Sequence, residues 1–252
     1  MPNILDRILA VKRDEVAALQ PHLAGLKAAC RDAPPGRSLA AALGRTESHS
    51  DFRFPISGFG SIRILAEVKH RSPSAGVICD PFDPPAIARA YEEGGADAVS
   101  CLTDREFFGG SIDDLRAVRA AVDLPILRKD FFVAPVQIYE ARAAGADGVL
   151  LIAEALDAAE MAGLASLAAE LGMDVLAEAH GEAALDRAIA CGARLVGVNN
   201  RDLTTFRVDR ATTERLAPRV REAGRVLVAE SGIRDAADVS RLLACGCDAI
   251  LV

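Results

Sequence analysis

From residue 63 onward, short apolar runs alternate with longer alanine-rich stretches along the chain. Four of the apolar runs follow one pattern, in which a glycine precedes a small residue, then Asp or Arg, then apolar residues: GGADAVSCL from Gly94, GADGVLLI from Gly145, GARLVGVN from Gly192 and GCDAILV from Gly246. Counted from Gly95, successive glycines are 50, 47 and 54 residues apart. Because one strand and one helix with their connections need roughly 25 to 30 residues, each step holds two β/α units.

The remaining apolar runs supply the strands that this spacing requires. They cover residues 63–69, 125–128, 174–178 and 225–230, and bring the predicted strands to eight. Helical patterns lie between the strands, for example at residues 84–93, 136–144, 158–171 and 236–244, and each ends near a glycine that suits a helix C-terminus. This alternation predicts an α/β fold with eight parallel strands closed into a (β/α)8 TIM barrel. A doubly wound sheet is disfavoured because no GxGxxG turn follows the first strand.

The residues before the first strand have a different pattern. Residues 3–33 predict two amphipathic helices, with Ile4, Leu5, Ile8, Leu9 and Val16 on roughly one face. Such a helix either plugs the bottom of the barrel or covers its mouth. Residues 44–60 are rich in Ser, Gly and Phe and predict a linker. We therefore expect residues 1–60 to form a helical extension and linker, residues 61–252 to form the barrel strands, and residues 1–252 to make one domain.

The last residue, Val252, falls at the end of the eighth predicted strand. We therefore expect the eighth helix and the last phosphate-binding loop to be missing, which would expose the outer faces of strands eight and one and weaken substrate binding.

Composition and charge exclude several classes of function. With 51% hydrophobic residues in 252, the chain can bury a large core. The net charge of -7 argues against a nucleic-acid or membrane partner, and the absence of a signal peptide or a spanning segment indicates a cytoplasmic protein. Six scattered cysteines and four separated histidines predict neither a metal site nor a disulfide, and we expect no cofactor.

Polar residues close several of the apolar runs, where a barrel strand meets its active-site loop. They are Glu67 and Lys69 after the first strand, Lys129 after the third, Glu178 after the fifth, Asn199 after the sixth, and Glu230 with Ser231 after the seventh. Ammonium groups among carboxylates stabilise each other, and partial burial moves pKa values toward neutrality. The pattern therefore predicts acid–base chemistry.

Covalent chemistry is the mechanistic alternative. Ser231 lies in AESGI rather than in a GxSxG turn, and His180, two residues beyond Glu178, is expected to cap an element or to face solvent. Lys129 or Lys69 could instead form a Schiff base, as in aldolase-type barrels.

Five motifs at these strand ends carry a resemblance to a known family. They are ILAEVKHRSPSAG (64–76), LTDREFFGGS (102–111), LRKDF (127–131), GVNNRDLTTF (197–206) and AESGI (229–233). Together with ILDRILAVKRDEV near the start, they make the chain resemble indole-3-glycerol-phosphate synthases of tryptophan biosynthesis over nearly its whole length. The N-terminal match favours a contribution of the first helix to the substrate mouth.

The resemblance implies a carboxy-lyase that closes the ring of 1-(2-carboxyphenylamino)-1-deoxyribulose 5-phosphate and releases carbon dioxide and water. In this interpretation Lys129 is the general acid and Glu178 carries the proton transfers of dehydration, while Lys69 and Arg201 are cations for the carboxylate or the phosphate. Glu67 and Glu230 orient the lysines and substrate hydroxyls, and Asn199 binds a hydroxyl or the developing oxyanion. The expected substrate-binding residues are Phe108 and Phe131 for the aryl ring and Ser72, Ser231 and Gly232 for the phosphate.

Three alternatives to this function stay open at this point. A phosphoribosylanthranilate isomerase would need an Asp and Cys pair, but Cys101 has no matching Asp at the end of the sixth strand. An aldolase is the second alternative, and a truncated barrel that binds without turnover is the third. Other tryptophan-pathway enzymes are the candidate protein partners.

Overall fold

The computed structural model describes residues 3–44, 62–202, 205 and 207–252. Eight parallel strands close into a barrel in the order β1-β10-β9-β8-β7-β6-β5-β4, which confirms the predicted TIM barrel. The strands are β1 (Arg63–Val68), β4 (Ala98–Leu102), β5 (Ile126–Lys129), β6 (Gly148–Ile152), β7 (Asp174–Ala179), β8 (Leu195–Asn199), β9 (Val226–Glu230) and β10 (Ala249–Leu251). A separate antiparallel hairpin, β2 (Arg71–Ser72) and β3 (Gly76–Val77), lies in the loop after β1.

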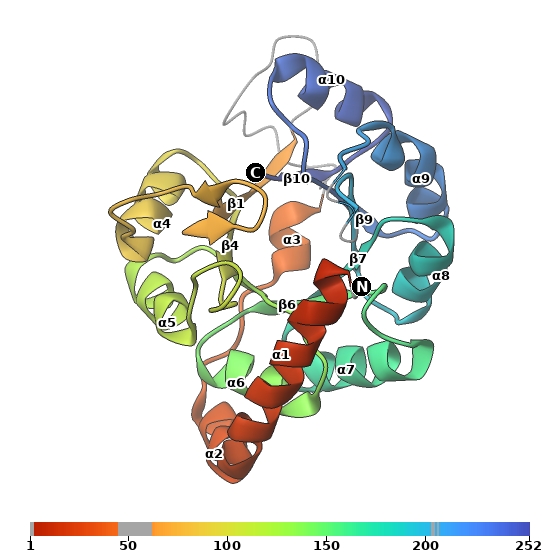
Figure 1. Ribbon diagram of the computed structural model, residues 1–252. Coiled ribbons are helices and arrows are strands. Elements are labelled where there is room, and N and C mark those ends of the chain that lie inside the picture. The colour runs from red at the N-terminus through yellow and green to blue at the C-terminus, as the bar shows by residue number, and fades with distance from the viewer. Residues whose placement is uncertain (1–2, 45–61, 203–204, 206) are drawn as a thin grey trace.

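A helix follows each barrel strand from β1 to β9 and packs on the outside of the ring (Figure 1). These helices are α4 (Pro84–Glu93), α5 (Ile112–Ala121), α6 (Pro135–Ala143), α7 (Ala158–Glu170), α8 (Glu182–Ala190), α9 (Ala211–Glu222) and α10 (Ala236–Ala244). The predicted bounds of α4 and α10 are confirmed, and those of α6 and α7 differ by one residue. Within the described residues no helix follows β10.

The glycine repeat has a local structural cause. Gly95, Gly145, Gly192 and Gly246 each have a φ between 84° and 92°, the left-handed conformation that ends a helix without a steric penalty. Where an aspartate follows two residues later, its carboxylate accepts a hydrogen bond from the first part of a neighbouring strand. Asp97 bonds to the Ile64 N–H at 2.8 Å, Asp147 to Ile126 at 2.9 Å and Asp248 to Leu227 at 2.8 Å. In three of the four repeats the aspartate therefore joins a pair of neighbouring strands, which matches the two-unit period.

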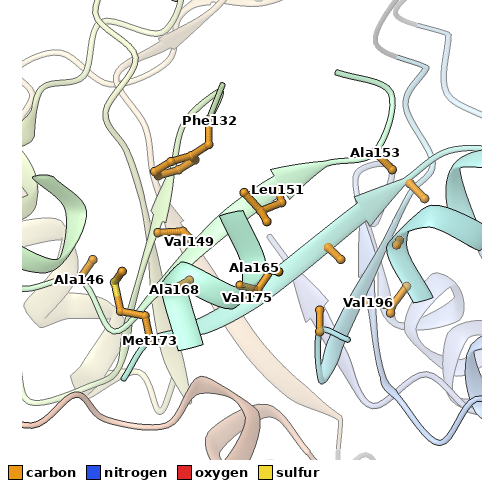
Figure 2. Packing of buried hydrophobic residues seen from close by; sticks show 14 of the residues in the cluster. Phe132, Ala146, Val149, Leu151, Ala153, Ala165, Ala168, Met173, Val175 and Val196 are labelled. Carbon is orange, nitrogen blue, oxygen red and sulfur yellow. The ribbon is translucent and has the colours of Figure 1, made fainter. Parts of the chain in front are cut away.

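The strands bury both of their faces, in two separate cores. Outward-facing side chains pack under the helices, and Figure 2 shows part of this shell, including Val149, Leu151 and Val175. Inward-facing side chains such as Leu127, Leu150 and Leu176 fill the barrel. Polar side chains meet beyond this inner core, at the carboxyl ends of the strands.

The N-terminal extension contacts both ends of the barrel. Helix α1 (Ile4–Leu19) crosses one side of the ring (Figure 1), and its Lys12 pairs with Asp104 and Asp130, which follow β4 and β5. Helix α1 therefore lies at the mouth. Its buried apolar residues are Leu5, Ile8 and Leu9; Ile4 and Val16, predicted on the same face, are only half-buried.

The opposite end of the barrel is closed by a helix that the sequence did not predict. After η1 (Gln20–His22) and α2 (Leu23–Asp32), the short helix α3 (Leu39–Leu43) buries Leu39 and Leu43 in the inner core. Leu39 lies against Gly148 at the start of β6, and Asp174 at the start of β7 accepts a hydrogen bond from the Ala40 N–H. Both alternatives for the extension are thus realised, by different helices. The predicted linker from residue 45 lies outside the described residues.

None of the helices within the described residues is long and apolar enough to cross a membrane.

Candidate active site

The mouth of the barrel holds two lysines among buried carboxylates. Lys129 at the end of β5 lies 2.9 Å from Glu67 and 3.3 Å from Glu230, both measured from the ammonium nitrogen to a carboxylate oxygen. Lys69, one residue beyond β1, pairs with the other oxygen of Glu67. Glu67 and Glu230 expose 6% and 0% of their side chains, so little water screens these pairs. Strands that are far apart in sequence thus bring these charges together.

The carboxylates keep Lys129 charged. Burial alone lowers the pKa of an ammonium group, but the nearby Glu67, Glu230 and Glu178 raise the pKa of Lys129 above its ordinary value. For Glu67, burial opposes ionisation, and the Lys129 and Lys69 charges more than offset it, so its pKa is lowered. The Lys129–Glu67 pair is therefore ionised at neutral pH.

A second carboxylate pair lies beside the lysines. Burial, followed by the charge of Glu178, raises the pKa of Glu230 to about 8. Glu178 in turn accepts a hydrogen bond of 3.1 Å from the Asn199 amide. Space for the Glu230 carboxyl is provided by Gly197 on the neighbouring strand, because a Cβ there would lie 2.2 Å from Glu230 Oε1. At pH 7 the Glu230 carboxyl therefore keeps its proton.

A cavity of about 260 Å³ opens above these groups. All the sequence-predicted site residues except Glu230 line it: Glu67, Lys69, Ser72, Phe108, Lys129, Phe131, Glu178, Asn199, Arg201, Ser231 and Gly232. Glu230 is fully buried and contacts the cavity through Lys129 and Glu178. Glu230 thus lies beneath the cavity and does not line the surface that a substrate would touch.

One wall of the cavity is apolar. The Phe108 and Phe131 rings have centroids 6.2 Å apart and planes tilted by 33°. Inward-facing strand residues Leu102, Leu150 and Ile152 complete the wall. This wall suits a flat aryl group.

At another part of the rim the chain adopts a left-handed turn after β9. Ser231 has a φ of 65° and Gly232 a φ of 77°, and both line the cavity together with Ser72 and Arg201. Of the described residues other than glycine, only Ser231 has a positive φ. Backbone turns of this kind form anion-binding concavities.

The prediction for His180 was wrong. Its side chain is 13% exposed, lies 3.3 Å from Glu154 and bonds to the Arg201 carbonyl. Burial lowers the pKa of His180, but the bond to Glu154 and the charge of Glu178 outweigh burial and raise it to about 9. A cationic histidine thus joins the loops after β6, β7 and β8.

Comparisons with known proteins agree with this geometry. A sequence profile named indole-3-glycerol phosphate synthase matches residues 5–252. Proteins of that name from Rhodopirellula baltica and Aromatoleum aromaticum are each 48% identical to this chain; the matches cover 99% and 100% of it and 92% and 93% of the relatives.

This chain belongs to the indole-3-glycerol phosphate synthase family.

Members of the indole-3-glycerol phosphate synthase family are carboxy-lyases of tryptophan biosynthesis that act on a small phosphorylated substrate. A solved deoxyribose phosphate aldolase from Aeropyrum pernix, described as tetrameric, has a TM-score of 0.56 and 20% identity, and covers 75% of this chain and 85% of its own. That likeness concerns the barrel fold alone.

Sequence reasoning missed the group that fixes α1 at the mouth. Lys12 exposes 1% of its side chain and lies 2.9 Å from both Asp104 and Asp130. Asp104 also accepts hydrogen bonds from the N–H groups of Phe107 and Phe108, and Asp130 accepts one from Phe131. The signal was a lysine among the apolar positions of an amphipathic helix, which a hydrophobicity pattern alone treats as solvent-facing.

No group of three or more His, Cys, Asp or Glu side chains that could hold a metal occurs in the part of the chain that the structure describes.

Proposed function

We propose that this chain converts 1-(2-carboxyphenylamino)-1-deoxyribulose 5-phosphate to indole-3-glycerol phosphate, with loss of carbon dioxide and water, in the cytoplasm. The observation that carries the proposal is the buried Lys129–Glu67–Glu230–Glu178 group beneath a cavity with an aryl-sized apolar wall. The substrate chemistry places the reaction among those of tryptophan synthesis, whose other enzymes are the candidate partners.

In the first step Lys129 acts as the general acid. The ring carbon that bears the carboxylate attacks the ketone carbon, and the ketone oxygen takes a proton from the Lys129 ammonium group. Two carboxylates within 3.3 Å orient that ammonium group. Stabilising developing charge in this way typically lowers the activation free energy by about 3 to 4 kcal/mol.

Loss of carbon dioxide follows. The bond to the carboxyl carbon breaks, and its electrons restore the aromatic ring. Lys69 or Arg201, which both line the cavity, would hold the carboxylate until it leaves. Carbon dioxide leaves as a neutral molecule, so the negative charge of the carboxylate is cancelled by the proton that Lys129 gave in the first step. Lys129 then regains a proton from solvent.

Dehydration requires one proton to arrive and one to depart. The hydroxyl on the former ketone carbon leaves as water after taking a proton, and the adjacent CH₂ group then loses a proton to complete the pyrrole ring. Glu178 lines the cavity, and its buried neighbour Glu230 has a pKa of about 8. Because Glu230 keeps its proton at neutral pH, it can supply that proton through Glu178 to the leaving hydroxyl, and Glu178 can later take the proton from carbon. Asn199 fixes the Glu178 carboxyl for both transfers.

Binding the two ends of the substrate uses different chemistry. Phe108 and Phe131 would hold the aryl ring, and Ser72 and the Ser231–Gly232 turn would hold the phosphate.

The alternatives have less support. A Schiff base at Lys129 needs a neutral amine, whereas the surrounding carboxylates raise the pKa of Lys129. An isomerase acid at Cys101 would have to face the cavity, but Cys101 packs into the outer core under the helices, and burial raises the pKa of its thiol.

The test supplies three substrates in separate reactions: the carboxyphenylamino substrate, phosphoribosylanthranilate and deoxyribose 5-phosphate. Indole fluorescence should appear with the first, together with one carbon dioxide per product. Turnover of either other substrate in place of the first would overturn the proposal, and binding of the first without turnover would identify an inactive barrel.

A further inference from the structure

Asn200 is a buried amide that the proposed reaction does not use. It follows β8 directly after Asn199, but it is 3% exposed and does not line the cavity. Its Nδ2 donates to the Ser231 carbonyl at 3.1 Å. Its Oδ1 accepts from the Thr213 N–H at 3.1 Å and from the Thr213 hydroxyl at 2.9 Å.

The contacts of Asn200 fix the orientation of its amide. Two donors from the first turn of α9 converge on Oδ1, so the NH₂ group must face Ser231. The backbone of Asn200 adds to this connection, since its N–H donates to the Glu230 carbonyl at 2.9 Å and its carbonyl accepts from the Asp209 N–H at 2.8 Å. Asn200 therefore connects the loop after β8 and the start of α9 to the turn after β9.

Ser231 needs such support. Its φ of 65° lies in the left-handed region, which is unfavourable for a residue with a Cβ because the Cβ comes too close to the backbone carbonyl oxygen. A residue persists in that conformation only where the surrounding structure holds it. The Asn200 bond acts on the carbonyl of this same residue.

We propose that Asn200 is a positioning residue for the phosphate end of the site, which holds the Ser231 carbonyl and so keeps the Ser231–Gly232 turn in its anion-binding conformation. The proposal rests on the assignment of the substrate phosphate to that turn under the proposed function. It does not involve Lys129 or Glu178, so chemistry and phosphate binding should separate in the kinetics.

The test variant is Asn200→Asp. The two side chains have nearly the same shape, so the bonds from Thr213 remain, but the carboxylate oxygen that replaces NH₂ faces the Ser231 carbonyl and repels it. We expect KM for the substrate and the inhibition constant of inorganic phosphate to rise together by about tenfold or more. We expect kcat to change by less than about threefold, because the Lys129 group is untouched. If Asn200→Asp does not fold, Asn200→Ala replaces it in the test, because it removes the donor to the Ser231 carbonyl without adding a charge. Thr212→Val is the matched control, because the Thr212 hydroxyl accepts from Arg215 and bonds to neither Asn200 nor Ser231.

A second background separates positioning from general damage. Glycine adopts positive φ without cost, so in a Ser231→Gly background Asn200→Asp should raise KM by a clearly smaller factor than in the wild type. An equal factor in both backgrounds would overturn the proposal, and so would an unchanged KM or a fall in kcat alone. Calorimetric binding of inorganic phosphate gives the same comparison without turnover. A wild type that binds phosphate but makes no indole product would therefore contradict the proposed function and still test Asn200.

Discussion

Glu230 shows how one buried residue sets the pH response of the site. Burial and the neighbouring Glu178 raise the pKa of Glu230 from 4.5 to about 8, so between these values the folded protein holds a proton that the unfolded chain has lost. The folded state binds more protons than the unfolded state in this window, and stability therefore falls as pH rises through it. The same proton is the one that we assign to dehydration.

The first prediction concerns Glu230→Gln, which resembles the protonated carboxyl at every pH. Between about pH 5 and pH 8 the melting temperature of the wild type should fall relative to that of the variant as pH rises. The reason is that only the wild type releases this proton when it unfolds. Melting scans at several pH values measure the difference. Parallel curves for the two proteins would contradict the raised pKa.

The second prediction concerns the space beside Glu230. Gly197→Ala would place a Cβ 2.2 Å from Glu230 Oε1 and 3.4 Å from Leu176 Cδ1, so we expect a loss of about 1 to 3 kcal/mol in the free energy of unfolding and a lower kcat. Gly163→Ala is the matched control, because Gly163 is exposed within α7 and nothing lies within 4 Å of its missing Cβ. The control should be stabilising by about 0.5 to 1 kcal/mol. Urea unfolding of both variants measures the two changes in the free energy of unfolding. Equal changes would contradict the expected clash between the added Cβ and Glu230.

At the scale of elements, the sequence predicts what local periodicity encodes. Strands and helices of the barrel follow from apolar runs and from glycine at helix ends, and for this reason α4 and α10 are predicted to the residue. Helix α3 has five residues and no clear pattern, and it forms because Leu39 and Leu43 fill the barrel's lower end. The position of α1 is likewise set by Lys12 and its partners, which are 92 and 118 residues away. Local periodicity does not encode such tertiary contacts; the one sign of them in the sequence is Lys12 among the apolar positions of α1.

The third prediction concerns the attachment of α1. Lys12→Met leaves the buried Asp104 and Asp130 carboxylates without their cation, which should lower the free energy of unfolding by about 3 to 5 kcal/mol. Because those carboxylates also hold the backbone of Phe108 and Phe131, KM should rise as well. Arg13→Met, an exposed neighbour on the same helix, should change stability by less than about 0.5 kcal/mol. Similar denaturation curves for the two variants would contradict the conclusion that Lys12 fixes α1 at the mouth.

At the scale of the whole molecule, the two ends of the barrel have different tasks. The carboxyl ends of the strands carry the charged cluster and the cavity, and the amino ends are closed by α3 through Leu39 and Leu43. Five of the residues that line the cavity could be predicted because polar side chains at strand ends are conspicuous: Glu67, Lys69, Lys129, Glu178 and Asn199. The apolar lining residues Leu102, Leu150 and Ile152 could not be predicted, because in the sequence they look like ordinary core residues of the strands.

The fourth prediction uses this division. Leu39→Ala should lower the free energy of unfolding by about 2 to 5 kcal/mol, because Leu39 is 1% exposed in the inner core. Its kcat and KM, measured well below the melting temperature, should match those of the wild type, since α3 lies at the end away from the cavity. A large change in KM for the folded variant would mean that the two ends are coupled.

The most direct test of the central claim is turnover of the carboxyphenylamino substrate by the wild type, Lys129→Ala and Lys129→Arg, followed by indole fluorescence. If Lys129 is the general acid held by Glu67 and Glu230, the wild type turns over and Lys129→Ala loses about a hundredfold or more in kcat. Lys129→Arg keeps the charge but transfers a proton poorly at neutral pH, so it should remain nearly as impaired. A Lys129→Ala enzyme within about tenfold of the wild type would contradict the account, because the acid would then have to lie elsewhere in the mouth.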